Sequence, residues 1–226
     1  MFWYYLFPSR YETEQMLRNY RVAHWGPFFS SQPKNISENF YREILLLAKK
    51  HINSNSVVLD IGCATGRLVF EYEKLGTRAT VGIDTSKKFI SFCNKMKEKR
   101  VKEILYHLDR SSSIFITGDV ISEQFANAPF SFISCVNIID RVENPRALVE
   151  KIASLLEKGG VALVVDPYNW DLSPAPKHLH VPNMKVLFDP NIWKMLEETR
   201  LPLVMLIDKT KTRTYNCHLV IMQKIS

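Results

Sequence analysis

The sequence has no pair of cysteines spaced to bind a metal or to form a redox motif. Its four cysteines are isolated from one another, and three of them lie within or beside apolar runs: Cys63, Cys93, Cys135 and Cys217. Such cysteines are typical of reduced, mostly buried thiols in a cytosolic protein. We therefore expect a cytoplasmic location, no bound metal and no disulfide.

Long apolar runs are also absent, since no run approaches the ~20 residues that a membrane span needs. Residues 1–7 are apolar, but they have no basic leader and end at Pro8, which is not typical of a signal peptide. They form either a tail or an aromatic arm packed on the domain, and the sequence does not distinguish these. No membrane partner is expected.

The positive charge is not concentrated, although the net charge is +7. The densest basic segment, residues 87–102, carries Phe89, Phe92, Cys93 and Met96 at helical spacing. Its lysines and arginine therefore fit the solvated face of an amphipathic helix. We do not expect nucleic acid as a partner, and no oligomeric state follows from the sequence.

What the sequence does contain is an alternation of strand and helix patterns. Its length of 226 residues and its hydrophobic fraction of 46% suit one well-buried domain. Strands are predicted over residues 56–61, 79–84, 113–117, 130–138 and 161–166, and helices over residues 36–51, 66–75, 86–100 and 146–157. This alternation predicts an α/β fold, a doubly wound and mostly parallel sheet, with ligands outside the carboxyl ends of the strands.

The last part of the chain departs from that alternation. Asp189 and Pro190 predict the start of a helix that runs to about Glu198. Two strands over residues 203–207 and 215–222 then suit an antiparallel pair at the edge of the sheet, which brings the predicted sheet to seven strands. We divide the chain into an N-terminal arm, residues 1–34, and the sheet domain, residues 35–226.

The turn after the first predicted strand says most about function. Asp60, Gly62, Cys63, Ala64 and Gly66 lie in an Asp-x-Gly-x-x-x-Gly pattern between a strand and a helix start, where backbone amides can approach a cofactor. The second glycine of the dinucleotide motif, which lets a pyrophosphate lie against the backbone, is replaced by Ala64. A nucleoside cofactor without a pyrophosphate fits best.

Two further strands end in acids. Asp84 ends the second strand, where a carboxylate can accept hydrogen bonds from a ribose diol, and Asp119 follows the third strand. An ordinary strand-to-helix turn, with glycines for geometry alone, is the alternative. It explains less, because three acids at one edge of a sheet repel one another.

The turn resembles motif I of the class I S-adenosylmethionine-dependent methyltransferases. The resemblance implies S-adenosylmethionine as cofactor, with Asp84 on the ribose hydroxyls, Asp119 on the adenine amino group, and Gly62 facing the methionine moiety. The implied cofactor-binding residues are Asp60, Gly62, Cys63, Ala64, Gly66, Asp84, Thr85, Asp119, Val120 and Val136. Methyltransferases of this class also end in an antiparallel strand pair.

Groups that bind the methyl acceptor are expected just past the fourth strand. Asn137 and Asp140 lie three residues apart and would share a face if the chain turns helical here. An amide and a carboxylate together can hold an imidazole ring, one on each nitrogen, and so fix its tautomer. The alternative, left open, is a surface charge pair of Asp140 with Arg141 and Asn137 as a strand-end cap.

The stretch after the fifth strand, Asp166 to Trp170, is similar to the Asp-Pro-Pro-Tyr signature of enzymes that methylate exocyclic amines of nucleic-acid bases. It lacks the second proline, and that signature follows the fourth strand. Tyr168 and Trp170 either wall the acceptor pocket or pack under a loop.

A narrower resemblance covers residues 11–170. Residues 11–13, 20–26, 59–67, 81–86, 137–145 and 166–168 look like the 4-mercaptohistidine N1-methyltransferase domain of ovothiol-forming sulfoxide synthases. The Asn-x-x-Asp-Arg piece is also similar to protein-histidine N1-methyltransferases. In the first group a phenylalanine commonly stands in place of Ala23, and a tyrosine in place of Trp25.

This resemblance implies an N-methyltransferase for a histidine-derived small molecule. Asn137 and Asp140 would bind the imidazole, and Tyr168 and Tyr11 would form pocket walls. A lone histidine such as His24 is usually a structural hydrogen-bonding group. The alternatives are a generic small-molecule or protein-histidine methyltransferase, an inactive subunit that keeps the fold and, more distantly, a nicotinamide oxidoreductase.

Overall fold

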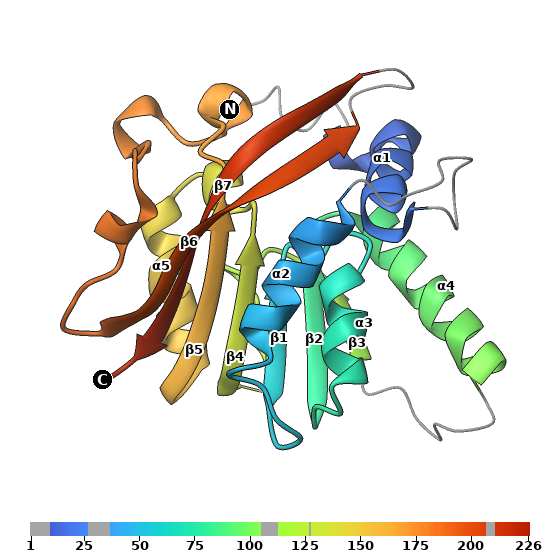
Figure 1. Cartoon of the computed structure of the whole chain (residues 1–226), viewed down its shortest axis with the longest axis horizontal. Helices are drawn as coiled ribbons and strands as arrows, with labels where there is room; N and C mark the ends of the chain where they lie inside the picture. The colour runs from blue at the N-terminus through green and yellow to red at the C-terminus, as the bar shows by residue number, and fades with distance from the viewer. Residues whose placement is uncertain (1–9, 27–36, 105–112, 127, 207–210) are drawn as a thin grey trace.

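The computed structural model describes residues 10–26, 37–104, 113–126, 128–206 and 211–226. Its centre is a seven-stranded sheet with the order β3-β2-β1-β4-β5-β7-β6 (Figure 1). The strands are β1 Val57–Ile61, β2 Ala79–Asp84, β3 Ser113–Thr117, β4 Phe130–Val136, β5 Leu156–Asp166, β6 Trp193–Leu206 and β7 Thr212–Lys224. The predicted doubly wound sheet and its C-terminal antiparallel pair are confirmed.

Strands β1 to β5 are parallel to one another, and β7 pairs antiparallel with both β5 and β6. The carboxyl ends of the parallel strands therefore meet at one edge, the upper edge in Figure 1. Alternate residues of β1 face opposite sides of the sheet, as the strand period requires. Leu59 and Ile61 enter one apolar cluster, and Val58 enters another.

Helices cover both faces of the sheet, as in doubly wound folds. They are α1 Glu14–Trp25, α2 Glu38–Ala48, α3 Arg67–Lys74, α4 Lys87–Ile104 and α5 Pro145–Leu155. Buried side chains of α2 and α3 pack with Val58 on one face, whereas those of α5 pack with Leu59 on the other. Asn144 caps α5, since its side chain accepts from the amides of Arg146 and Ala147 at 3.1 Å.

Two of the predicted helices have different ends in the structure. Helix α5 ends at Leu155, earlier than predicted, and β5 begins at Leu156, earlier than the predicted residue 161. Leu156 already pairs with Phe130 of β4, so sheet pairing takes these residues from the helix. The helix predicted over residues 36–51 is α2, which begins at Glu38 and ends at Ala48.

The helix predicted from Asp189 to Glu198 is wrong. Asp189 caps only a short turn, accepting from the Asn191 amide at 2.9 Å, and β6 begins at Trp193. Pairing with β7 along the whole of β6 overrides the local helix-forming composition. In Figure 1 the two strands form a long ribbon that rises past the carboxyl edge of the sheet toward α1.

The N-terminal segment packs on the rest of the protein. A short 3-10 helix, η2 Arg10–Glu12, contacts α4, and α1 contacts both η2 and β6. The apolar start, residues 1–7, and the boundary expected at residues 34 and 35 lie outside the described residues. Within the described residues, no helix combines the length and the apolar character that a membrane crossing requires.

Candidate active site

A cavity opens at the carboxyl edge of the sheet. It contains about 970 Å³ of empty space, its open mouth and the solvent there included. The predicted cofactor residues that line it are Asp60, Gly62, Cys63, Ala64, Asp84, Thr85, Asp119, Val120 and Val136.

The exception is Gly66. It does not line the cavity, so the predicted contact between Gly66 and the cofactor is corrected. Gly66 is the N-cap residue of α3 and has a φ of 79°. A Cβ added there would lie 3.0–3.1 Å from Cys93, Phe115 and Phe70. Its role is therefore to let the turn pack closely on the side chains behind it.

The amides of the turn are used within the protein. Gly62 N and Cys63 N both donate to the carbonyl of Ile83, at 2.8 and 3.0 Å. Gly66 N donates to the Cys63 carbonyl at 2.8 Å. A pyrophosphate site needs such amides free and aimed at the ligand, so the turn fits a nucleoside without a pyrophosphate.

Asp84 is fixed at the wall of the cavity by two backbone amides. Its Oδ2 accepts from Ala64 N at 2.9 Å and its Oδ1 accepts from Ser86 N at 2.8 Å. Burial raises the pKa of Asp84, and these two hydrogen bonds oppose that rise. Each carboxylate oxygen keeps a second lone pair, so the side chain fits a ribose diol that donates two hydrogen bonds.

Asp119 lies farther along the same edge, after β3. Its Oδ1 accepts from the Ile121 amide at 3.0 Å, and its side chain is exposed at the cavity. The neighbouring apolar side chains Val120, Ile138 and Val142 also line the cavity. An acid beside apolar walls fits an adenine ring, which is flat and donates from its amino group.

Asp60 is the most deeply buried acid that lines the cavity, with 3% of its surface exposed. The Ser134 hydroxyl donates to Asp60 Oδ1 at 2.6 Å. Burial raises the pKa of Asp60 to about 7, against the effect of that hydrogen bond and with a contribution from Asp84. This carboxyl can therefore change charge near neutral pH.

The predicted acceptor residue Asn137 lies in the cavity wall. Its φ is 59°, a left-handed conformation that is uncommon outside glycine, and its amide donates to the Val165 carbonyl at 2.7 Å. The Cys217 thiol donates to Asn137 Oδ1 at 3.8 Å. A strained residue held this firmly at a ligand cavity is typical of a functional position.

Asp140, in contrast, does not line the cavity, and the predicted imidazole contact is corrected. Its side chain is fully buried, with Oδ2 accepting from the Asn169 amide at 2.8 Å. It also lies 3.4 Å from Arg141, so the charge pair forms, but below the surface. Burial and the nearby Asp140 raise the pKa of Asp166 to about 8. Asp140 therefore joins the segments that follow β4 and β5.

Tyr168 is also turned away from the cavity, and its predicted role as a wall is corrected. Its φ is 56°, and its hydroxyl accepts from the Met184 amide at 2.8 Å and meets His218 Nδ1. Trp170 stacks on His180, with ring centroids 4.5 Å apart, as the packing alternative expected. Tyr11 does line the cavity.

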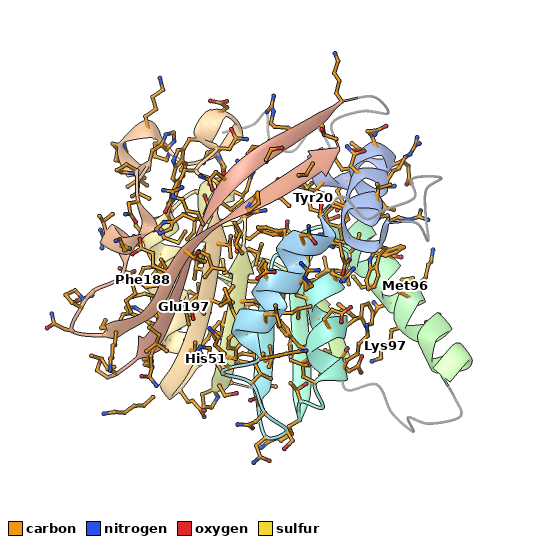
Figure 2. The ribbon with its side chains drawn as sticks, in the orientation of Figure 1. Tyr20, His51, Met96, Lys97, Phe188 and Glu197 are labelled. Carbon is orange, nitrogen blue, oxygen red and sulfur yellow. The ribbon has the colours of Figure 1, made fainter. Side chains whose placement is uncertain are left out.

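The sequence did not identify the aromatic cover of the cavity. Tyr20 and His24 of α1 and Tyr41 of α2 line it together with Tyr11 and Phe89. Figure 2 labels Tyr20 between α1 and the carboxyl edge of the sheet. The four-residue spacing of Tyr20 and His24 places both on one face of α1, which is the signal that could have found them.

His24 joins this aromatic cover to the turn at residues 62–66, called here the cofactor turn. Its Nδ1 lies 2.8 Å from Thr65 Oγ1 and its Nε2 lies 2.8 Å from the Tyr41 hydroxyl. Burial, followed by the charge of Arg67, lowers the pKa of His24 to about 3, so the ring is neutral. The Trp25 indole also donates to the Thr65 carbonyl at 3.1 Å. The expected structural role of His24 agrees with these contacts.

Comparison with known proteins identifies the class. A family model described as a methyltransferase domain matches residues 34–200. The ubiquinone biosynthesis O-methyltransferase of Xylella fastidiosa strain 9a5c is 30% identical over 114 residues, which are 50% of this chain and 43% of that protein. The corresponding mitochondrial enzyme of Dictyostelium discoideum is 26% identical over 110 residues, 46% of this chain and 32% of that protein. The matches thus span less than half the length of these two relatives.

Solved structures agree on the fold. The N-methyltransferase NodS from Bradyrhizobium japonicum superposes with a TM-score of 0.61 at 14% identity, over 85% of this chain and 99% of that one. A putative methyltransferase from Bacillus halodurans gives 0.61 at 12% identity, over 82% and 100%. The chain therefore belongs to the methyltransferase domain family.

Proposed function

We propose that this chain is an S-adenosylmethionine-dependent methyltransferase that acts on an imidazole nitrogen of a histidine-derived small molecule, with 4-mercaptohistidine as the first example. The observation that carries the proposal is the position of Asn137. Its backbone has a left-handed conformation, and the residue lies at the cavity wall. Its sequence context, Asn-x-x-Asp-Arg, is the piece that resembles histidine N-methyltransferases.

Bound S-adenosylmethionine supplies a methyl group that the sulfonium charge already activates. The protein is left to hold the acceptor in line with that methyl and to exclude water. Asp84 and Asp119 would hold the nucleoside, and the turn at Gly62 would face the methionine moiety. The aromatic cover formed by Tyr11, Tyr20 and the rings beside them would exclude water.

Asn137 would select the reactive tautomer of the acceptor. Its Oδ1 can accept the N–H of an imidazole ring, and the Cys217 thiol limits rotation of the amide. The other ring nitrogen then carries a lone pair instead of a proton, which is the form that can attack a methyl group.

Asp140 supports this site from the interior of the protein and does not contact the ring. It links the backbone of Asn169 to the residues just after Asn137, and it pairs with Arg141. The Asn-x-x-Asp-Arg piece thus brings Asn137 and Arg141 to the cavity wall and uses the acid to fix the segment that carries them.

The test is transfer of label from S-adenosylmethionine to a panel of acceptors. The panel contains 4-mercaptohistidine, histidine, carnosine, a histidine peptide and, because the relatives named above are O-methyltransferases, a catechol. We expect transfer to a small imidazole, at a ring nitrogen identified by NMR. Transfer to the catechol alone, or to none of the panel despite donor binding, would reject the imidazole assignment; the second result would favour a binding subunit or another acceptor.

A further inference from the structure

Arg141 uses only part of its guanidinium group within the protein. Its Nη1 donates to the carbonyls of Asp140 at 3.0 Å and Asn169 at 2.8 Å, and it lies 3.4 Å from Asp140 Oδ1. Within the described part of the chain, Nη2 and Nε have no such partner. Because Arg141 also lines the cavity, its unused donors are available to a ligand there.

Tyr20 presents a second unused donor to the same cavity. No hydrogen bond to its hydroxyl occurs among residues 10–26, 37–104, 113–126, 128–206 and 211–226. Burial raises the pKa of Tyr20, and the charge of Arg141 acts in the opposite direction, so Arg141 lies within electrostatic range of the phenol. The phenol therefore remains protonated and can donate.

Arg141 lies away from the residues that fit the nucleoside, whereas Tyr20 of α1 lies within electrostatic range of both Asp84 and Arg141. Asp84 ends β2 and Asp119 follows β3, at one side of the sheet order. Arg141 follows β4 and bonds to Asn169 beyond β5, on the other side of β1. The Gly62 turn lies between them. The cavity is thus divided into a nucleoside end rich in carboxylates and an acceptor end with a cation and a phenol.

We propose that Arg141 and Tyr20 form a carboxylate subsite, so that the methyl acceptor is a small molecule with a free carboxylate near the methylated atom. A guanidinium with two N–H groups on one edge matches a carboxylate in a bidentate pair. The Tyr20 hydroxyl would add a third hydrogen bond. The imidazole part of the acceptor rests on the proposed function, whereas the carboxylate rests on these two residues.

The charge around Arg141 permits an added anion. Asp140 is the acid in contact with its guanidinium, and Asp166 lies next to Asp140. Burial and the nearness of Asp140 raise the pKa of Asp166 to about 8, which favours the uncharged form of Asp166 at neutral pH. The guanidinium thus has one acid in contact with it, and its free edge can take a further anion.

The first experiment compares matched acceptors that differ only in the carboxylate. Histidine is paired with histidinamide, and imidazole-4-acetate with imidazole-4-acetamide, and kcat/KM is measured for each. We expect the carboxylate of each pair to be preferred by at least about tenfold. Equal values within each pair, or a histidine inside a peptide that reacts as well as free histidine, would overturn the subsite.

Three variants assign the preference to its residues. Arg141→Gln removes the charge and should bring each pair within about twofold, and Arg141→Lys should keep only part of the preference because it lacks the fork. Tyr20→Phe removes one hydroxyl and should reduce the preference by a few fold. Arg146→Gln is the control, since it makes the same charge change at an exposed position on α5.

Donor binding distinguishes the two possible carboxylates. If Arg141 holds the acceptor, Arg141→Gln leaves the Kd of S-adenosylmethionine within about twofold, and thermal unfolding confirms that the variant is folded. If the Kd rises about tenfold and the acceptor preference stays, Arg141 holds the carboxylate of the donor and the inference is overturned.

A binding measurement separates this inference from the imidazole assignment. Calorimetry with S-adenosylhomocysteine-saturated protein compares imidazole-4-acetate and 4-hydroxybenzoate with their amides. Tighter binding of the carboxylates, lost in Arg141→Gln, supports the subsite even if no imidazole is methylated. Amides that bind as tightly as the acids overturn it, whatever the fate of the proposed function.

Discussion

Asp84 is the residue on which donor affinity should depend most directly. Both of its oxygens are fixed by backbone amides, so its remaining lone pairs have a defined direction. We expect Asp84→Ala to weaken binding of S-adenosylmethionine by about 1.5–3 kcal/mol, the value of a hydrogen bond to a charged group. Calorimetry measures this, with Asp84→Asn as an intermediate case. An unchanged Kd would remove Asp84 from the donor site.

Gly62 and Gly76 make a matched pair for testing the turn. Both have a left-handed φ, 69° and 77°, but an added Cβ meets Ile138 Cδ1 at 2.1 Å in the first and nothing within 4 Å in the second. Gly76→Ala should cost only the conformational strain, about 1–2 kcal/mol of unfolding free energy. Gly62→Ala should cost more and reduce donor binding.

Urea unfolding of the two variants gives the comparison. The double variant Gly62→Ala/Ile138→Ala removes the side chain that the new methyl group meets, so part of the lost donor affinity should return. Equal destabilisation at both glycines would mean that backbone strain, and not the approach to Ile138, decides the residue at position 62.

Asp60 links stability to pH. Burial raises its pKa from 3.8 to about 7, so between these values the folded protein holds a proton that the unfolded chain releases. The stabilisation is complete below pH 3.8 and is lost as pH rises through about 7. In this range wild type should lose about 1 kcal/mol per pH unit more than Asp60→Asn.

The measurement is the difference in unfolding free energy between wild type and Asp60→Asn at several pH values, which cancels the other titrating groups. The asparagine can still accept from Ser134, so the hydrogen bond remains. Parallel pH profiles for the two proteins would show that Asp60 is ionised throughout.

Motif residues and acceptor residues differ in how well the sequence predicts them. Asp84 and Gly62 were placed in the cavity because a strand end and a tight turn are local features whose geometry the sequence pattern determines. The sequence also placed Asp140 and Tyr168 at the cavity, and the structure does not. Their side-chain directions follow a left-handed backbone at Asn137 and at Tyr168 itself. Positive φ outside glycine leaves no clear signal in sequence.

At the scale of elements, β6 shows where local pattern fails. Asp189 and Pro190 resemble a helix start, and the residues from Lys194 to Glu198 favour helix. The decisive information is β7, which lies later in the chain and pairs with β6 from Trp193 to Leu206. A long-range partner of this kind cannot be read from a window of ten residues.

Helix α1 offers a prediction at this scale. His24 joins α1 to Thr65 of the cofactor turn through one hydrogen bond and to Tyr41 through another. His24→Phe and Thr65→Val should each destabilise the protein, and the double variant should lose less than their sum, by about 1 kcal/mol. Chemical unfolding of the four proteins gives this coupling energy. Simple additivity would mean that the contact does not hold α1 in place.

The same variants should loosen the cover without unfolding the sheet. Proteolysis should then cut within α1 first, while β1 and β4 stay protected, since the sheet has its own buried clusters. Tyr41→Phe is the control, because it removes the second contact of His24 and leaves the one to Thr65.

For the whole molecule, the sequence predicted the sheet because alternating strands and helices admit few arrangements. It did not predict the cavity's cover, which brings α1 and α2 over residues from the ends of β1, β2 and β4. Tyr20 and Arg141 are far apart in sequence, and only the folded chain places both at one cavity. The acceptor end is therefore a property of tertiary structure.

Because the donor cavity joins so many elements, donor binding should stabilise the whole fold. A ligand at about 100 times its Kd adds about 2.7 kcal/mol, which should raise Tm by about 5–10 °C for a chain of this length. S-adenosylmethionine should produce this shift, whereas NAD should not, since the amides of the Gly62 turn are already bonded to Ile83 and the turn itself. Thermal scans of wild type and Asp84→Ala with each ligand make the comparison. Asp84→Ala should reduce the shift at the same ligand concentration without abolishing it. A shift with NAD, or an undiminished shift with S-adenosylmethionine in Asp84→Ala, would contradict this assignment of the donor site.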